Sequence, residues 1–235
     1  MNVIIRNIPN SITCLNIASG VMAILCAFRG TEPMWGLDGY SWCWIFIGLA
    51  ALADFCDGFA ARMLHAYSSL GKELDSLCDL VSFGVAPAVL MFMTMSDMGL
   101  QDWTPWLVFI IPVCGALRLA RFNIDDRQHF SFIGLPIPAN AIFWIGYSAL
   151  CLQGNDSFTQ WYWFLPVILA ESWLMVSPVK FFSLKFKTYG WKGNRWRWLM
   201  AATAILLVAI MGVPGLLWTI VVYLGYSLLD IAAPE

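Results

Sequence analysis

Long apolar runs separated by short polar breaks dominate the pattern of this 235-residue chain. A helix needs about 20 mainly apolar residues to span a membrane, and eight stretches reach or approach that length. These stretches are residues 12–28, 41–62, 74–96, 104–122, 134–151, 161–179, 197–211 and 214–230. We therefore predict an all-α, polytopic membrane protein with about eight transmembrane helices, folded as one domain over residues 1–235. The last two stretches are short enough to form a single hairpin.

The charged residues strengthen this prediction. They make up 12% of the chain, whereas a soluble domain typically carries about 25%, so much of the surface is expected to face lipid. When the N-terminus is placed in the cytoplasm, every Lys and Arg except Arg29 falls on the cytoplasmic side. Basic residues accumulate on that side of membrane proteins, so we expect both termini to be cytoplasmic.

Four aspartates interrupt the apolar pattern at one expected membrane edge. Asp54 and Asp57 lie near the end of the second stretch, and Asp75 and Asp79 lie near the start of the third. Residues three or four apart share a helix face, so each pair should project together from antiparallel neighbouring helices. Acidic residues bordering a spanning helix are costly and are functional candidates by default. Four facing carboxylates need cations between them, and oxygen ligands suit Mg²⁺ or Mn²⁺.

Phosphoryl transfer is the chemistry that this pattern favours. Paired metal ions can neutralise a diphosphate and stabilise the oxygen that leaves. Gly58 leaves room for a nucleotide beside the acids, and Arg62, one turn later, can contact phosphate. Two alternatives stay open: a structural network with Arg62 and Lys72, and a cation or proton transporter. Transporters tend to place their acids near the middle of the bilayer, whereas these acids lie at its edge.

The same residues resemble a known signature. The motif of the CDP-alcohol phosphatidyltransferase family reads D-x-x-D-G-x-x-A-R followed by G-x-x-x-D-x-x-x-D. The matching residues are 54–62 and 71–79. The resemblance implies that Asp54, Asp57, Asp75 and Asp79 bind a pair of Mg²⁺ or Mn²⁺ ions. It also implies that Asp79 is the general base that deprotonates the acceptor hydroxyl.

The resemblance further implies which residues hold the CDP-linked lipid. Gly58, Arg62 and Ser68 are the expected contacts around the signature. Family members often carry Asn-x-x-Thr near the start of the first helix, and Asn10 and Thr13 match it, so both are candidate nucleotide contacts. Asn10 could instead cap that helix, because asparagine is a favoured N-cap residue.

The acceptor follows from a closer resemblance, to the phosphatidylserine synthase branch of the family. The similar stretches are residues 70–87, 117–123 and 132–138, within a motif core of residues 10–140. Relatives with phosphorylated acceptors usually carry Pro and Lys where this chain has Ser76 and Leu80. The resemblance implies transfer from CDP-diacylglycerol to L-serine by a homodimer that binds no nucleic acid. Glycerol 3-phosphate and an inositol phosphate are the alternative acceptors.

Four residues are candidate contacts for the serine acceptor, and each has a second interpretation. Arg118 or Arg121 could bind the serine carboxylate or the lipid diphosphate, or could act as a cytoplasmic-side anchor. Asn123 could accept a hydrogen bond from the serine ammonium group or simply end its helix. Ser82 could shape the acceptor pocket or pack in the core. We expect this site to face the cytoplasm from a bacterial inner membrane.

Overall fold

The computed structural model describes residues 3–100, 103–124, 132–154, 160–181 and 194–232. Its α-helices are α1 (Val3–Ala27), α2 (Gly39–Met63), α3 (Ser69–Asp79), α4 (Ala86–Asp97), α5 (Ile110–Ile124), α6 (Ile137–Leu152), α7 (Trp161–Val176), α8 (Arg195–Met211) and α9 (Gly215–Ala232). A π-helical segment, η1 (Leu80–Val85), joins α3 to α4, and a 3₁₀ segment, η2 (Thr104–Phe109), leads into α5. The described strands form two short antiparallel pairs: β1 (Pro33–Met34) with β2 (Leu37–Asp38), and β3 (Phe132–Ile133) with β4 (Lys180–Phe181). The predicted all-α class is confirmed.

Each of the eight predicted stretches forms a helix, and the first begins earlier than predicted. α1 starts at Val3 instead of near residue 12, and Pro9 lies inside it. Asn10 is therefore an internal helix residue, and the interpretation that it caps the helix start is wrong. The polar residues before Ile12 hide this part of the helix from a count of apolar positions. At the other end of the chain, α8 and α9 pack against each other as a hairpin.

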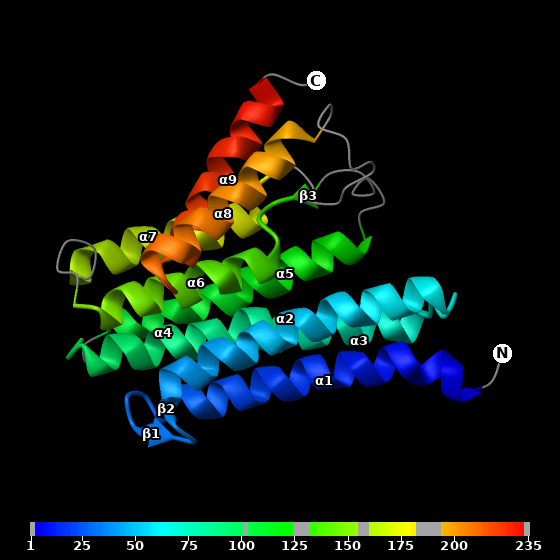
Figure 1. Ribbon diagram of the computed structural model, residues 1–235, viewed down its shortest axis with the longest axis horizontal. Helices are drawn as coiled ribbons and strands as arrows, with labels where there is room; N and C mark the ends of the chain where they lie inside the picture. The colour runs from blue at the N-terminus through cyan, green and yellow to red at the C-terminus, as the bar shows by residue number, and fades with distance from the viewer. Residues whose placement is uncertain (1–2, 101–102, 125–131, 155–159, 182–193, 233–235) are drawn as a thin grey trace.

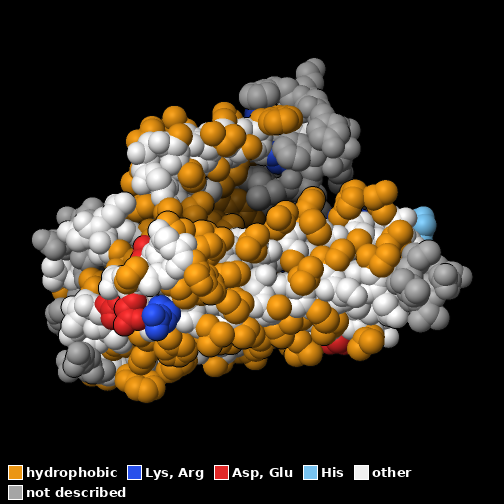
Figure 2. Space-filling model, turned by 60° about the horizontal axis from the view of Figure 1, so that its bottom comes forward, with side chains coloured by type: hydrophobic (Ala, Val, Ile, Leu, Met, Phe, Trp, Pro, Cys, Tyr) orange, Lys and Arg blue, Asp and Glu red, His pale blue; other side chains and the backbone are white. Residues whose placement is uncertain are grey.

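Four helical segments are long and apolar enough to cross a membrane: Asn7–Ala27, Gly39–Met63, Ser69–Asp97 and Thr104–Ile124. Three further apolar helices, within α6, α7 and α9, are shorter. Many large apolar side chains lie on the outside, and Figure 2 shows hydrophobic side chains over much of one long face. Soluble monomers rarely expose apolar patches of this extent, so the surface indicates a protein embedded in lipid.

α2 illustrates how the sequence turns the acids inward. Its buried residues Cys43, Ile47, Ala50 and Asp57 recur at intervals that keep them on one helix face. The opposite face exposes large apolar side chains. These are Ile45, Leu49, Leu52, Phe55, Phe59 and Met63. The helix thus presents one face to lipid and carries Asp57, together with Asp54 one turn earlier, on the other.

α1, α2 and α3 form the part of the bundle that holds the acids. α1 packs along α2 and also contacts α3, η1 and α4, while α5 packs against η1 and α7. Figure 1 shows the start of α1, the connection from α2 to α3, and the end of α5 at the same end of the bundle. The chain closes with α9, which packs on α6 and α8. Side chains from α1, α2, α3 and α5 can therefore meet near one end of the molecule.

The contact between α6 and α9 depends on Gly146. A Cβ atom at this position would collide with the backbone nitrogen of Leu217, which cannot move aside as a side chain can. We expect Gly146→Ala to push the two helices apart and to destabilise the protein by about 1–3 kcal/mol. Thermal unfolding in detergent measures the change.

Gly48→Ala is the matched control for this variant. Gly48 is also a helical glycine, but an added Cβ would meet no described atom within 4 Å. Alanine is the better helix former by about 1 kcal/mol, so this variant should be as stable as the native protein or slightly more stable. Equal melting of the two variants would contradict the tight α6–α9 contact.

Candidate active site

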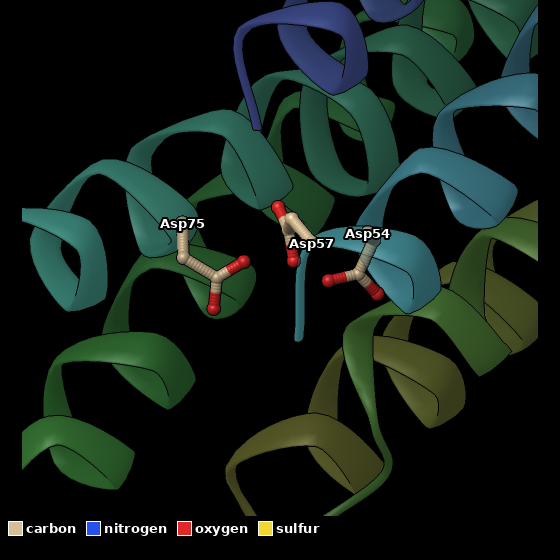
Figure 3. A group of neighbouring side chains, drawn as sticks. All are labelled: Asp54, Asp57 and Asp75. Atoms are coloured by element: carbon tan, nitrogen blue, oxygen red, sulfur yellow. The ribbon is translucent and has the colours of Figure 1, made fainter. Parts of the chain in front are cut away.

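Three of the predicted acids, two on α2 and one on α3, lie close together. One carboxylate oxygen from each of Asp54, Asp57 and Asp75 lies within 4.8 Å of the other two. Figure 3 shows the three carboxylates turned toward one another, two from α2 and one from α3. Carboxylates this close repel unless positive charge lies between them. The arrangement therefore fits a bound cation.

The burial of these acids also favours a bound cation. Asp57 is only 6% exposed, and Asp54 and Asp75 are half-buried. Asp57 Oδ2 and Asp75 Oδ1 are buried without a hydrogen-bond partner among the described residues. Leaving a buried acceptor unsatisfied costs about 1–3 kcal/mol, and more for a charged group. Oxygen-only donors that lack partners match the ligand preference of Mg²⁺ or Mn²⁺, so the residues present fit the predicted metal.

Asp79 lies one helical turn beyond Asp75, and the three-carboxylate group does not include it. Its side chain is buried, and Oδ1 accepts a hydrogen bond of 3.1 Å from Asn16 Nδ2 on α1. The guanidinium of Arg118 on α5 is near enough for its charge to act on this carboxylate. Asp54 and Asp75 are also near enough for their charges to act on Asp79, which differs from the other three acids in its hydrogen bond from Asn16 and its proximity to Arg118.

A cavity of ≈ 220 Å³ opens beside the acids, where α1, α2 and α3 meet. Four of the five predicted CDP-lipid contacts line it, together with two of the aspartates. The lining includes Asn10, Thr13, Asp57, Gly58, Ser68 and Asp75. Arg62, the fifth predicted contact, is exposed and outside the lining, but its Nη1 would lie 3.6 Å from a Cβ on Gly58. Its guanidinium is thus next to the cavity.

The start of α3 is shaped to form one wall of this cavity. Ser68 caps the helix, since its Oγ accepts a hydrogen bond of 3.0 Å from the backbone N–H of Gly71. A Cβ on Gly71 would lie 3.0 Å from both Ser68 Oγ and Asn10 Oδ1, so glycine allows α3 to begin close against α1. Lys72, also in the lining, donates from Nζ to the backbone oxygen of Asn123 at 2.8 Å.

The structure separates the four predicted acceptor contacts into two groups. Arg118 and Ser82 are buried near Asp79: Arg118 is 7% exposed, and Ser82 Oγ donates to the backbone oxygen of Asn16 at 3.0 Å. Arg121 is exposed and donates to the backbone oxygen of Val176 at 2.9 Å.

Asn123, the last of the four, reaches back to α3. Its Nδ2 donates to Ser76 Oγ at 2.9 Å, in addition to the hydrogen bond that its backbone oxygen accepts from Lys72. This pair of hydrogen bonds ties the end of α5 to α3, the helix that carries Asp75 and Asp79. The side chains of Asn123 and Arg121 are therefore engaged in contacts between helices.

Two features of the site are absent from the sequence-based predictions. The first is Asn16, whose only signal is a third polar residue following Asn10 and Thr13 at helical spacing on an apolar helix. The second is η1, the wide π-helical segment that begins directly after Asp79. Asn140 Nδ2 donates to the backbone oxygen of Phe83 in this segment at 3.0 Å. Segments of this kind occur frequently at functional sites.

Comparison with known proteins agrees with this geometry. The model of the CDP-alcohol phosphatidyltransferase family matches residues 6–181, so the chain belongs to that family. The chain is 36% identical over 225 residues to a CDP-diacylglycerol–serine O-phosphatidyltransferase of Mycobacterium leprae, covering 91% of this chain and 70% of that protein. It is similar to proteins of the same name from Bacillus subtilis (39% over 146 residues; 58% and 72% covered) and Methanocaldococcus jannaschii (40% over 147 residues; 62% of each). Membership of this family, together with the four long apolar helical segments, identifies the protein as an integral membrane transferase.

Proposed function

We propose that this protein transfers the phosphatidyl group of CDP-diacylglycerol to the hydroxyl of L-serine, which yields phosphatidylserine and CMP. The observation that carries the proposal is similarity over 91% of the chain to a CDP-diacylglycerol–serine O-phosphatidyltransferase. The acid cluster and the cavity supply a site where that chemistry can take place. Ser76 and Leu80, which replace the Pro and Lys usual in relatives with phosphorylated acceptors, support serine as the acceptor.

The residues divide into donor and acceptor roles. The CDP-diacylglycerol diphosphate lies against the Asp54, Asp57 and Asp75 cluster, where Mg²⁺ or Mn²⁺ neutralises its charge when bound. Gly58 allows the nucleotide to approach the backbone of α2, and Arg62 contacts phosphate from the cavity rim. A diphosphate at this position lies within reach of both the membrane edge and the cytosolic solvent.

Asp79 acts on the acceptor. Its carboxylate takes the proton from the serine hydroxyl as that oxygen attacks the lipid-bearing phosphorus. The new bond joins the serine oxygen to this phosphorus, and the bond that breaks joins the same phosphorus to the oxygen of the departing CMP. Arg118, buried beside Asp79, is the cation best situated to bind the serine carboxylate.

The arrangement in the membrane follows the distribution of charge. Eight spans with both termini in the cytoplasm would put every Lys and Arg except Arg29 on the cytoplasmic side. In that topology the cavity faces the cytoplasm from a bacterial inner membrane, where soluble serine and CMP exchange freely. A single domain over residues 1–235 and a homodimer remain predictions from the sequence and its family resemblance.

An acceptor assay tests the proposed function. Purified protein in detergent receives CDP-diacylglycerol, Mg²⁺ or Mn²⁺, and one acceptor at a time: L-serine, glycerol 3-phosphate or an inositol phosphate. We expect serine-dependent release of CMP and formation of phosphatidylserine. Release with glycerol 3-phosphate or the inositol phosphate instead would refute serine as the acceptor. Ion flux in proteoliposomes without CMP release from any alcohol would refute the transferase and favour a transporter.

A further inference from the structure

Asn16 continues a row of polar side chains along α1. Asn10 and Thr13 line the cavity, and Asn16 follows Thr13 at the same helical spacing. On the neighbouring helix, Asp79 follows Asp75 by one turn and receives the hydrogen bond from Asn16. The row therefore leads from the proposed nucleotide site to the carboxylate that accepts the hydroxyl proton.

The orientation of the Asn16 amide follows from its neighbours. An ionised carboxylate only accepts hydrogen bonds, so the NH₂ group must face Asp79 Oδ1, at 3.1 Å. The backbone oxygen of Asn16 accepts from Ser82 Oγ at 3.0 Å, and Gly20 one turn later packs directly on Ser82. These contacts hold the side chain in one position and turn its Oδ1 away from Asp79.

Asn16 Oδ1 is a buried hydrogen-bond acceptor that no described donor satisfies. The residue is 0% exposed, and this oxygen has no hydrogen-bond partner within the described ranges. Native proteins rarely leave such a group unsatisfied, and each exception calls for an explanation. A ligand that donates a hydrogen bond at this point would provide one.

A second unsatisfied group near Asp79, this time a hydrogen-bond donor, belongs to Arg118. It is buried near Asp79, and its Nε is a donor without a partner in the part of the chain that the structure describes. Asp79 therefore has an unsatisfied acceptor and an unsatisfied cationic donor in its surroundings. L-Serine carries matching groups next to its hydroxyl: an ammonium that donates and a carboxylate that accepts.

We propose that Asn16 binds the acceptor through its Oδ1, which accepts from the serine ammonium group, while its Nδ2 positions Asp79 against the serine hydroxyl. Arg118 binds the carboxylate, so that three groups hold the zwitterion. This assignment rests on the proposed function, because it identifies the residue of that same site that selects an amino acid over a simple alcohol.

Asn16→Leu tests the ammonium contact, because leucine has a similar volume and no polar atom. We expect KM for serine to rise about 10- to 100-fold, as expected for loss of a buried hydrogen bond to a charged group. KM for CDP-diacylglycerol should stay unchanged. The preference for L-serine over 3-hydroxypropionate, which lacks the ammonium, should fall by a similar factor. The preference for serine over ethanolamine, which lacks the carboxylate, should fall in Arg118→Gln but not in Asn16→Leu.

Asn16→Asp preserves the shape of the side chain and separates its two roles. It also keeps the assignment testable if Asn16→Leu does not fold. This variant keeps an oxygen at the position of Oδ1 but replaces the donating amide by a second carboxyl group beside Asp79. Two carboxyl groups this close share a proton, which hinders Asp79 from taking one from serine, so kcat should fall while the preference over 3-hydroxypropionate is retained. Ser11→Ala, an exposed polar residue of the same helix, should change none of these constants.

The assignment to Asn16 would be overturned if Asn16→Leu left both the KM for serine and the preference over 3-hydroxypropionate unchanged, or if Asn16→Asp left kcat unchanged. Either result would leave the proposed function intact. Absence of serine-dependent CMP release by the native protein would overturn the proposed function and this assignment with it. The two failures are distinguished by the native protein measured in the same assay.

Discussion

Replacing Asp79 with asparagine should abolish turnover while CDP-diacylglycerol remains bound. The substitution preserves the size of the side chain but removes the basic oxygen that we propose takes the serine proton. General base catalysis typically contributes about 10²- to 10⁴-fold, so we expect kcat to fall by about 100- to 10,000-fold in a site without a substitute base. CMP release in single-turnover assays measures the chemical step, and equilibrium binding of the CDP-lipid measures retention of the donor.

The structure also predicts what this variant does locally. In Asp79→Asn the amide can rotate to keep its oxygen toward Asn16 Nδ2, so the buried hydrogen bond between α1 and α3 survives. Near-native turnover would show that another group accepts the proton. Asp97→Asn is a suitable control, because Asp97 accepts from Tyr40 Oη at 2.7 Å on the end of α4 away from α3. It should retain turnover even if it lowers stability.

Asp57→Asn should weaken metal binding itself and, with it, metal-dependent binding of the donor lipid. Asp57 is the most buried member of the carboxylate group and has an oxygen without a partner among the described residues. Residues that only support a metal ligand typically contribute 10- to 100-fold to affinity, so loss of a ligand should cost at least about 100-fold. Titration of the protein with Mn²⁺, followed by electron paramagnetic resonance, measures this without turnover.

Glu73→Gln provides the matched control for the metal experiment. It removes one negative charge from α3 within two residues of Asp75, but Glu73 is exposed and belongs to neither the carboxylate group nor the cavity lining. We expect its Mn²⁺ affinity to equal that of the native protein. Equal affinities for native protein and Asp57→Asn would show that the cluster does not hold the ion.

Local spacing was sufficient to predict the acid cluster. Asp54 and Asp57 lie three residues apart at the end of an apolar stretch, and helical periodicity turns both away from lipid. The same reasoning predicts that Asp75 faces them from the next helix, which the structure confirms. It does not predict the hydrogen bond that Asp79 accepts from Asn16, because Asn16 lies 63 residues earlier in the chain.

The contacts proposed for the serine acceptor were less predictable from the sequence, because they also depend on residues that are distant along the chain. Arg118, Arg121 and Asn123 are neighbours in the sequence and look equivalent as polar residues at a helix end. In the structure, Arg118 is buried beside Asp79, whereas Arg121 bonds to α7 and Asn123 bonds to α3. Packing of α5 between other helices makes this distinction, and no local pattern encodes it.

The chain alone therefore specifies the membrane setting, the helices, the two aspartate pairs and the family, since each depends on composition or on spacing within about one or two helical turns. The folded molecule adds the surroundings of Asp79: Asn16 from α1, Ser82 from η1 and Arg118 from α5. These side chains meet because distant helices pack together, and a buried group must find its hydrogen-bond partners wherever the fold brings them. The aspartates point to phosphoryl transfer, and their neighbours in space point to the acceptor.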